Sequence, residues 1–127
     1  MGSKISSLQK LDKARMLLPQ YLSIHLISLN FEPKLARIHA ILRDNVQIYI
    51  RYNNYGEYSY TIIFSKTSLD RCRFDNYDDR WDVSTRPHHF HPRKKKGAIH
   101  SDMTGNPEED IPYLCELVLS SKLYDIE

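Results

Sequence analysis

The sequence predicts an α+β fold, in a single domain over residues 1–127, with a helical segment at each end and a sheet between them. The sheet is expected to be an antiparallel meander of about four to five strands, flanked by an N-terminal helix or helices and a C-terminal helix. In the middle of the chain, apolar residues recur at every second position, the period of a half-buried strand. Near both ends they recur at helical spacing instead.

The N-terminal segment, residues 1–32, is predicted to be helical. Leucine and isoleucine side chains recur at roughly helical spacing over residues 4–18. Pro19 is expected to end or kink this helix, because a proline ring clashes with the preceding turn. The next run, residues 21–29, fits a helix and a strand about equally well, and we favour the helix.

Residues 35–77 are predicted to form the sheet, because apolar and polar residues alternate through four successive runs. The runs are separated by turn residues such as Asn and Gly, which tolerate a positive φ. Consecutive runs joined by short turns pair as antiparallel hairpins. The four predicted strands are residues 36–42, 46–52, 57–65 and 69–77.

Residues 78–105 have no clear period and are rich in His, Lys and Pro, so we expect a long functional loop. Trp81 is one of the apolar residues expected to anchor this loop to the body of the domain. The C-terminal helix is predicted over residues 107–124. Asn106 and Asp110 are both candidate N-caps, and Pro112 favours Asp110, because proline is tolerated in a first helical turn.

Composition narrows the class of protein. The formal net charge is only +2, so the distribution of charge says more about partners than the total. Cys72 and Cys115 are far apart and neither belongs to a CxxC pair, which argues against a structural zinc knuckle and for reduced core residues. The N-terminus has no signal-peptide pattern, and no run is long and apolar enough to span a membrane. We therefore expect a cytoplasmic protein.

The most distinctive segment is residues 85–93, in which two prolines bracket a cluster of three histidines. If this segment is extended, His89 and His91 share one face while His88 and Phe90 point the other way. Three kinds of chemistry fit this arrangement: metal binding, acid–base catalysis near neutral pH, and phosphate binding. A solvated loop or an edge strand with incidental histidines is the non-functional interpretation.

Two neighbouring features have competing interpretations as well. The run Arg93-Lys94-Lys95-Lys96 suits a phosphate backbone, but it is equally typical of a solvated turn. Asp75 and Asn76, at a predicted strand end, are typical of an Asx-turn that begins the loop. Alternatively, Asp75 lies close enough to orient a histidine through its second ring nitrogen.

With these residues in view, the chain resembles the TumE-like toxins of prokaryotic toxin–antitoxin pairs. The resemblance is carried by Arg73-Phe-Asp75-Asn76 at a strand end and by Pro87-His88-His89-Phe90-His91, and it covers roughly residues 40–120. It implies a small toxin encoded beside a helix-turn-helix antitoxin, with RNA as the suspected target.

Under this resemblance the leading hypothesis is a small ribonuclease that uses histidine acid–base chemistry. No cofactor is predicted, although a divalent metal is possible, held by His89 and His91 with His100 or with Asp75. The candidate catalytic residues are His88, His89, His91, Asp75 and Arg73. The candidate substrate-binding residues are Arg86, Arg93, Lys94, Lys95 and Asn76.

The rival hypothesis is a non-catalytic module that uses the His- and Lys-rich loop to bind nucleic acid or a protein. Under either hypothesis the expected partners are an antitoxin and RNA, and a homodimer is one possible assembly. No membrane partner is expected.

Overall fold

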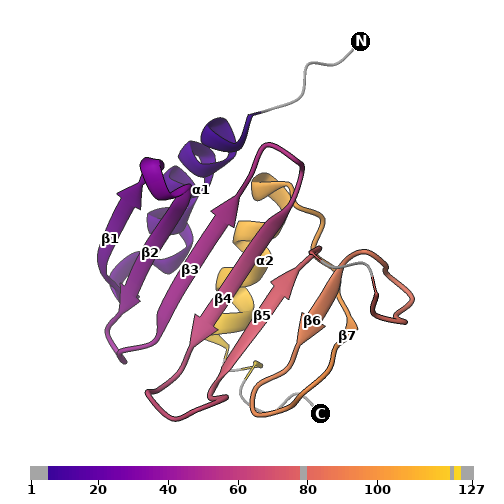
Figure 1. The fold of residues 1–127 in the computed structure, drawn as a ribbon. Coiled ribbons are helices and arrows are strands. Elements are labelled where there is room, and N and C mark those ends of the chain that lie inside the picture. Colours follow the sequence, from indigo (N-terminus) through magenta and orange to yellow (C-terminus); the bar gives the residue numbers. More distant parts are fainter. Residues whose placement is uncertain (1–5, 78–79, 121, 124–127) are drawn as a thin grey trace.

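Seven antiparallel strands form one open sheet whose spatial order is the order of the sequence, β1 to β7 (Figure 1). The computed structural model describes residues 6–77, 80–120 and 122–123. The strands are β1 (Leu26–Glu32), β2 (Arg37–Leu42), β3 (Gln47–Tyr52), β4 (Tyr58–Ile63), β5 (Arg71–Asp75), β6 (His89–His91) and β7 (Ile99–His100). The helices are α1 (Ser7–Leu22) and α2 (Pro107–Leu119), with short 3-10 turns η1 (Ser23–His25) and η2 (Pro33–Leu35).

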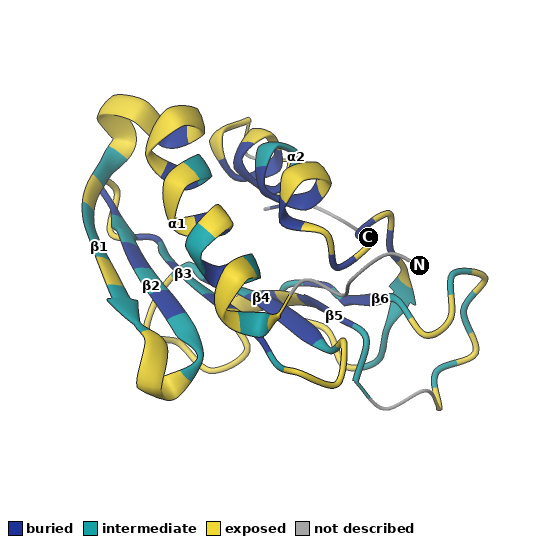
Figure 2. Ribbon diagram, turned by 90° about the horizontal axis from the view of Figure 1, so that it is seen from above, coloured by how far each residue is buried: buried dark blue, intermediate teal, exposed yellow. Residues whose placement is uncertain are grey.

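Both helices cover the same face of the sheet, so the molecule has two layers (Figure 2). The core lies between these layers, because the alternation in each strand sends one set of side chains towards the helices. In β3, for example, Ile48, Ile50 and Tyr52 are buried while the residues between them are not. Among the described residues, no helix lies on the opposite face of the sheet, which we call the open face.

The predicted meander is confirmed for all four strands between residues 36 and 77, each within a few residues of its expected ends. The α+β class and a helix at each end are confirmed too, but α2 ends at Leu119 and not at the predicted residue 124. Cys72 and Cys115 are buried free thiols, as expected. In the part of the chain that the model describes, no helix has the length and apolar character needed to cross a membrane.

The helical prediction for residues 1–32 is wrong over its last quarter. α1 runs through Pro19 and ends at Leu22, and residues 26–32 form strand β1 instead of a helix. The local pattern is ambiguous, and pairing with β2 decides it: Leu29 lies opposite Ala40 and Phe31 opposite Ile38, both on the buried face. Tertiary packing overrides a weak local preference here.

The prediction of a long loop over residues 78–105 is wrong for two short stretches. Residues 89–91 and 99–100 form β6 and β7, and together with β1 they bring the sheet from the expected four to five strands to seven. At α2 the N-cap is Asn106, whose side chain accepts from the backbone N–H of Glu108, so the preference for Asp110 is also wrong. Pro107 takes the first helical position instead.

A few predicted ends fall on residues that the model leaves undescribed. These are residues 1–5 of the N-terminal segment, residues 78–79 at the start of the predicted loop, and residues 121 and 124 near the end of the predicted C-terminal helix.

Candidate functional site

Two rows of polar side chains cross the open face of the sheet, because residues in register on neighbouring strands point to the same side. In the first row, Ser59 lies opposite Asp75, and Asp75 lies opposite His89. In the second row, Thr61 lies opposite Arg73, and Arg73 lies opposite His91. Strand register therefore brings the strand-end motif and the histidine motif together.

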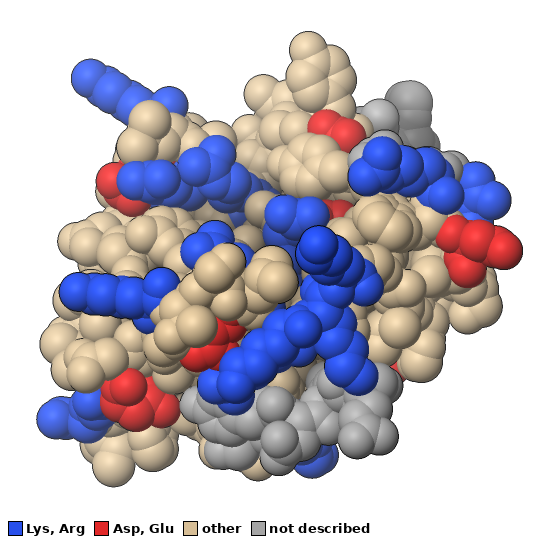
Figure 3. Space-filling model, turned by 60° about the horizontal axis from the view of Figure 1, so that its bottom comes forward, with Lys and Arg blue, Asp and Glu red and all other residues tan. Residues whose placement is uncertain are grey.

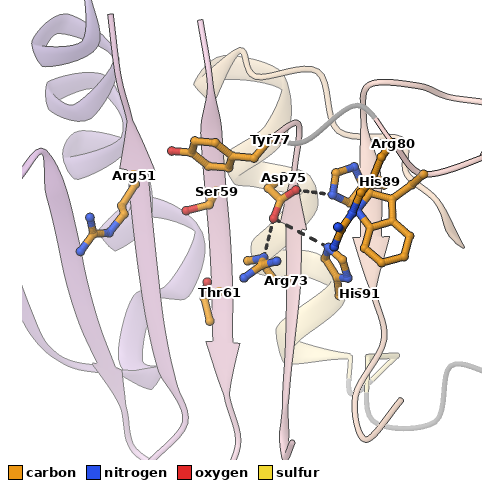
Figure 4. A pocket seen from close by; sticks show the side chains of 10 residues that line it. Arg51, Ser59, Thr61, Arg73, Asp75, Tyr77, Arg80, His89 and His91 are labelled. Carbon is orange, nitrogen blue, oxygen red and sulfur yellow. Dashed lines mark ion pairs between the residues drawn. The ribbon is translucent and has the colours of Figure 1, made fainter. Parts of the chain in front are cut away.

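These rows form the floor of a pocket of about 450 Å³ (Figure 4). Strands β3 to β6 supply most of the lining, and the segment between β5 and β6 supplies the rest. The lining residues are Arg51, Ser59, Thr61, Arg73, Asp75, Tyr77, Arg80, Trp81, His89 and His91. Among the described lining residues, three guanidinium groups share one hollow with a single carboxylate, which favours an anionic ligand.

Asp75 lies at the centre of the pocket floor, with its side chain only 1% exposed. Its Oδ1 is 2.5 Å from Nε2 of His89, and its Oδ2 forms an ion pair with Nε of Arg73. Nε2 of His91 is 3.9 Å from the same Oδ2. The ligand atoms of Asp75, His89 and His91 all lie within 4.8 Å of one another, which makes these residues a candidate metal-binding group.

The second ring nitrogen of each histidine is held by a backbone carbonyl. Nδ1 of His89 donates to the carbonyl oxygen of Pro87 at 2.9 Å, and Nδ1 of His91 donates to that of Gly97 at 3.0 Å. A carbonyl oxygen only accepts, so in the neutral rings the proton is on Nδ1 and the lone pair is on Nε2. Both lone pairs consequently face Asp75.

The two histidines differ in access to the pocket. His89 is 2% exposed, whereas the side chain of His91 is 18% exposed. Burial lowers the pKa of His91, and the hydrogen bond to the Gly97 carbonyl opposes this shift. The Trp81 ring lies edge-on to His91, with ring centroids 5.3 Å apart. His91 therefore presents a neutral, oriented imidazole whose ring is partly exposed to the pocket, while its Nε2 is buried against Asp75.

Two other predicted histidines lie outside the pocket lining. His88 points to the helix-covered side, as the alternation predicted, and its Nδ1 shares a 2.8 Å hydrogen bond with the Tyr58 hydroxyl. His100 lies opposite His89 in the register of β6 and β7, but it is exposed and does not join the candidate metal-binding group of the described residues. Asp75, and not His100, is the residue that the fold places beside the two histidines.

The predicted substrate-binding residues are also spread out. The Asn76 side chain accepts from the backbone N–H of Tyr58 and donates to the carbonyl of Gly56, so it braces the β3–β4 turn. Arg93 pairs with Asp70 and lies over the Phe64 ring. Three exposed residues of the predicted set lie away from the pocket lining: Arg86, Lys94 and Lys95.

The sequence analysis missed several pocket residues. Arg51, Ser59 and Thr61 stand at polar positions of alternating strands, and this alternation was the available signal for the face they share. Their distance from the histidines depends on strand register, which a local pattern does not contain. Arg80 lies against the Trp81 ring at 4.9 Å, and no sequence signal singled it out.

The pocket lies on a surface with abundant positive charge. Figure 3 shows Lys and Arg side chains gathered around the middle of one face, with fewer and more scattered Asp and Glu side chains. A guanidinium-rimmed hollow on an open sheet face, with histidines and a buried carboxylate on its floor, is typical of a protein that acts on or binds a phosphate-bearing ligand.

Comparison with known proteins identifies the family to which the chain belongs. The family model "Toxin TumE" matches residues 23–118, so the chain belongs to the TumE toxin family, as the two motifs indicated. It is therefore a toxin component of a toxin–antitoxin system, with an antitoxin as partner. No curated protein and no solved structure matches the chain significantly.

Proposed function

We propose that this toxin acts on RNA as a small ribonuclease, with histidine acid–base chemistry in the open-face pocket. The observation that carries the proposal is the meeting of Asp75, His89 and His91 with three arginines in one hollow. Guanidinium groups recognise phosphate through charge-assisted, often bidentate hydrogen bonds. An imidazole with a lowered pKa is a general base at neutral pH.

The proposed reaction is attack of the ribose 2′-oxygen on the adjacent phosphorus. A rotation of the partly exposed His91 ring brings its Nε2 to the 2′-hydroxyl, where it takes the proton as the new P–O bond forms, and Arg73 stabilises the charge of the pentacoordinate phosphorane. The bond from phosphorus to the 5′-oxygen then breaks, and that oxygen takes a proton from water. The hydroxide left behind recovers the proton that His91 carries. The products are a 2′,3′-cyclic phosphate and a 5′-hydroxyl.

The other members of the pocket serve positioning roles in this proposal. His89 is too deeply buried to reach an RNA chain, and it lies against one oxygen of Asp75 while Arg73 pairs with the other. His88 acts indirectly, through its hydrogen bond to Tyr58. The exposed Lys94 and Lys95 contribute long-range attraction for the RNA backbone.

The finer identity of the partners belongs to the same proposal. We expect the antitoxin to be a helix-turn-helix protein encoded beside the toxin, and the pair to act in the cytoplasm, where its RNA substrate lies. A homodimer of the toxin is compatible with this arrangement. Co-expression with the product of the neighbouring gene, followed by co-purification and sizing, tests the antitoxin and the assembly.

The test of the reaction uses a defined RNA oligonucleotide and a copy with a single 2′-deoxy nucleotide at the cleavage position. Cleavage of the first, with 2′,3′-cyclic phosphate ends, and protection of the second would support the proposal. Cleavage of both would contradict attack by the 2′-oxygen. Salt-dependent RNA binding without any cleavage would favour a non-catalytic nucleic-acid-binding module instead.

A further inference from the structure

Asp75, His89 and His91 form a group on the pocket floor whose candidate ligand atoms all lie within 4.8 Å of one another. The three residues come from adjacent positions on two paired strands, so the sheet itself fixes their separation. The ring planes of His89 and His91 are nearly perpendicular, with centroids 4.8 Å apart. Both rings direct Nε2 towards the carboxylate (Figure 4).

This group contains more hydrogen-bond acceptor atoms than the surrounding donors can satisfy. Among the described residues, the two buried side-chain polar atoms without a hydrogen-bond partner are Oδ1 of Asp75 and Nε2 of His91. His89 Nε2 is only 2.5 Å from that Oδ1, but the two atoms do not form a hydrogen bond. Buried lone pairs are normally matched by a donor or a cation.

We infer that Asp75, His89 and His91 bind a divalent transition-metal ion, with zinc as the reference case. Metal-ligating histidines usually donate their other ring N–H to a backbone carbonyl or a carboxylate, as both histidines do here. Two imidazoles and one carboxylate suit zinc and its first-row neighbours and not calcium or magnesium, which prefer oxygen ligands. The inference stands on this geometry and does not rest on RNA as substrate.

The distances fit an ion after a side-chain adjustment. Zinc binds nitrogen and oxygen ligands at about 2.0–2.2 Å, so two ligands of one ion lie roughly 3–3.5 Å apart. His89 Nε2 is 2.5 Å from Oδ1 of Asp75 and His91 Nε2 is 3.9 Å from Oδ2, and the three candidate ligand atoms are spread over up to 4.8 Å. The widest separation would therefore have to close by roughly 1.3 Å, through side-chain rotation of the histidines about the carboxylate.

One neighbour opposes the ion. Arg73 pairs with Oδ2 of Asp75, and its positive charge disfavours a second cation at the same carboxylate. Three protein ligands leave at least one coordination position free, and that position opens into the pocket. The metal site therefore has a coordination position open to a ligand. The charge of Arg73 lowers its affinity for the ion, and an anionic ligand in the pocket raises that affinity.

Binding of an ion has a consequence for the proposed reaction. The lone pair of His91 Nε2 serves either as a base or as a ligand, but not as both at once. Zinc bound at this group therefore suppresses cleavage that depends on His91 as a base.

The experiment is a calorimetric titration of the full, untagged chain with zinc chloride, after EDTA treatment and dialysis. We expect one zinc ion per chain and a rise in melting temperature with zinc concentration. Asp75→Asn and His91→Ala should weaken binding by at least about 100-fold, the upper end of what it costs to lose a residue that only orients a ligand. His91→Gln serves if the alanine variant fails to fold. His100→Ala, which removes an exposed histidine from the next strand, is the matched control and should bind normally.

Failure of wild type to bind zinc, or equal binding by wild type and His91→Ala, would overturn the metal site. Addition of zinc to the RNA assay separates this inference from the proposed function. Zinc binding together with reduced cleavage supports both. If zinc binds and cleavage requires it, the metal site is supported and His91 is rejected as the base. Intact cleavage without any zinc binding rejects the metal site alone.

Discussion

Two buried carboxylates lie on opposite faces of the same sheet, and their surroundings differ sharply. Asp110, at the start of α2, accepts from the Tyr60 hydroxyl at 2.6 Å and from the Gly105 N–H at 2.7 Å through Oδ2. Its Oδ1 accepts from the N–H and the hydroxyl of Thr104. Asp75, on the open face, has one oxygen without a hydrogen-bond partner and faces two imidazole lone pairs.

The hydrogen-bond partners separate a structural carboxylate from a functional one when burial alone does not. Both side chains belong to residues that are only 1% exposed. The groups that donate to Asp110 tie the turn before α2 to the core. Both oxygens of Asp110 therefore have hydrogen-bond partners. Asp75, by contrast, has an oxygen without a hydrogen-bond donor, and it lies on the floor of a pocket that a ligand can enter. Unsatisfied polar groups at a pocket are a signature of a site that acts on something else.

The largest expected effect comes from His91. His91→Ala removes the proposed base and should lower the RNA cleavage rate by about 10²–10⁴-fold, the usual contribution of general acid–base catalysis. The free energy of unfolding should change little, because this side chain is partly exposed and makes one hydrogen bond to a backbone carbonyl. Cleavage kinetics and urea unfolding of the same preparation check both statements. A variant that cleaves at the wild-type rate would remove His91 from the mechanism.

The second effect should appear in stability and not in activity. Asp110→Ala leaves the Tyr60 hydroxyl and the Gly105 N–H without their acceptor in a buried region, and it also removes the acceptor of the N–H of the exposed Thr104. We expect the free energy of unfolding to fall by about 3–5 kcal/mol. The fraction that remains folded should cleave RNA normally. Chemical unfolding followed by circular dichroism measures the loss, and a change below about 1 kcal/mol would contradict the structural role.

A third carboxylate, that of Asp70, should make the stability of the fold depend on pH. Hydrogen bonds from Arg93 and Ser65 lower the pKa of Asp70 below its usual value. Since the folded-state pKa lies below the unfolded one, this group stabilises the fold above the unfolded pKa of about 4. That contribution is lost as pH falls through the folded-state pKa. The stability difference between wild type and Asp70→Asn should therefore shrink in acid, as unfolding at a series of pH values would show. A difference that is independent of pH would contradict it.

The smallest effect concerns the lysine turn between β6 and β7. Lys95→Ala combined with Lys96→Ala should weaken RNA binding a few-fold and reduce the salt slope by about 1 for each phosphate that a lysine no longer neutralises. Lys94 is left unchanged because its backbone φ is 62°, so a substitution there would change backbone strain as well as charge. The cleavage rate at saturating RNA should stay at the wild-type value. A large loss of that rate would place the lysines in the reaction centre.

Much of the fold follows from the sequence, because the strands from β2 to β5 are long enough for alternation to show. β6 and β7 have three and two residues, too few for any period to appear. β1 is ambiguous in sequence because its apolar residues fit both periods, and only its pairing with β2 resolves the choice. Short or ambiguous segments depend on tertiary partners.

The candidate site was predicted in part. The strand-end and histidine motifs pointed to Asp75, His89 and His91, and the alternation correctly sent His88 to the other face. Arg51 was missed because its approach to the site depends on the register of three strands. Asn76 looked functional in sequence, but its side chain bonds to backbone groups of the neighbouring turn. Such assignments require coordinates.

The most direct test is to measure unfolding and RNA cleavage side by side for Asp75→Asn and Asp110→Asn. These are the same change in two buried carboxylates, so each variant is the control for the other. We predict that Asp75→Asn keeps its stability and loses cleavage, whereas Asp110→Asn loses stability and cleaves normally when folded. If both variants lost the same property, or if Asp75→Asn cleaved RNA like wild type, the open-face pocket would not be the functional site.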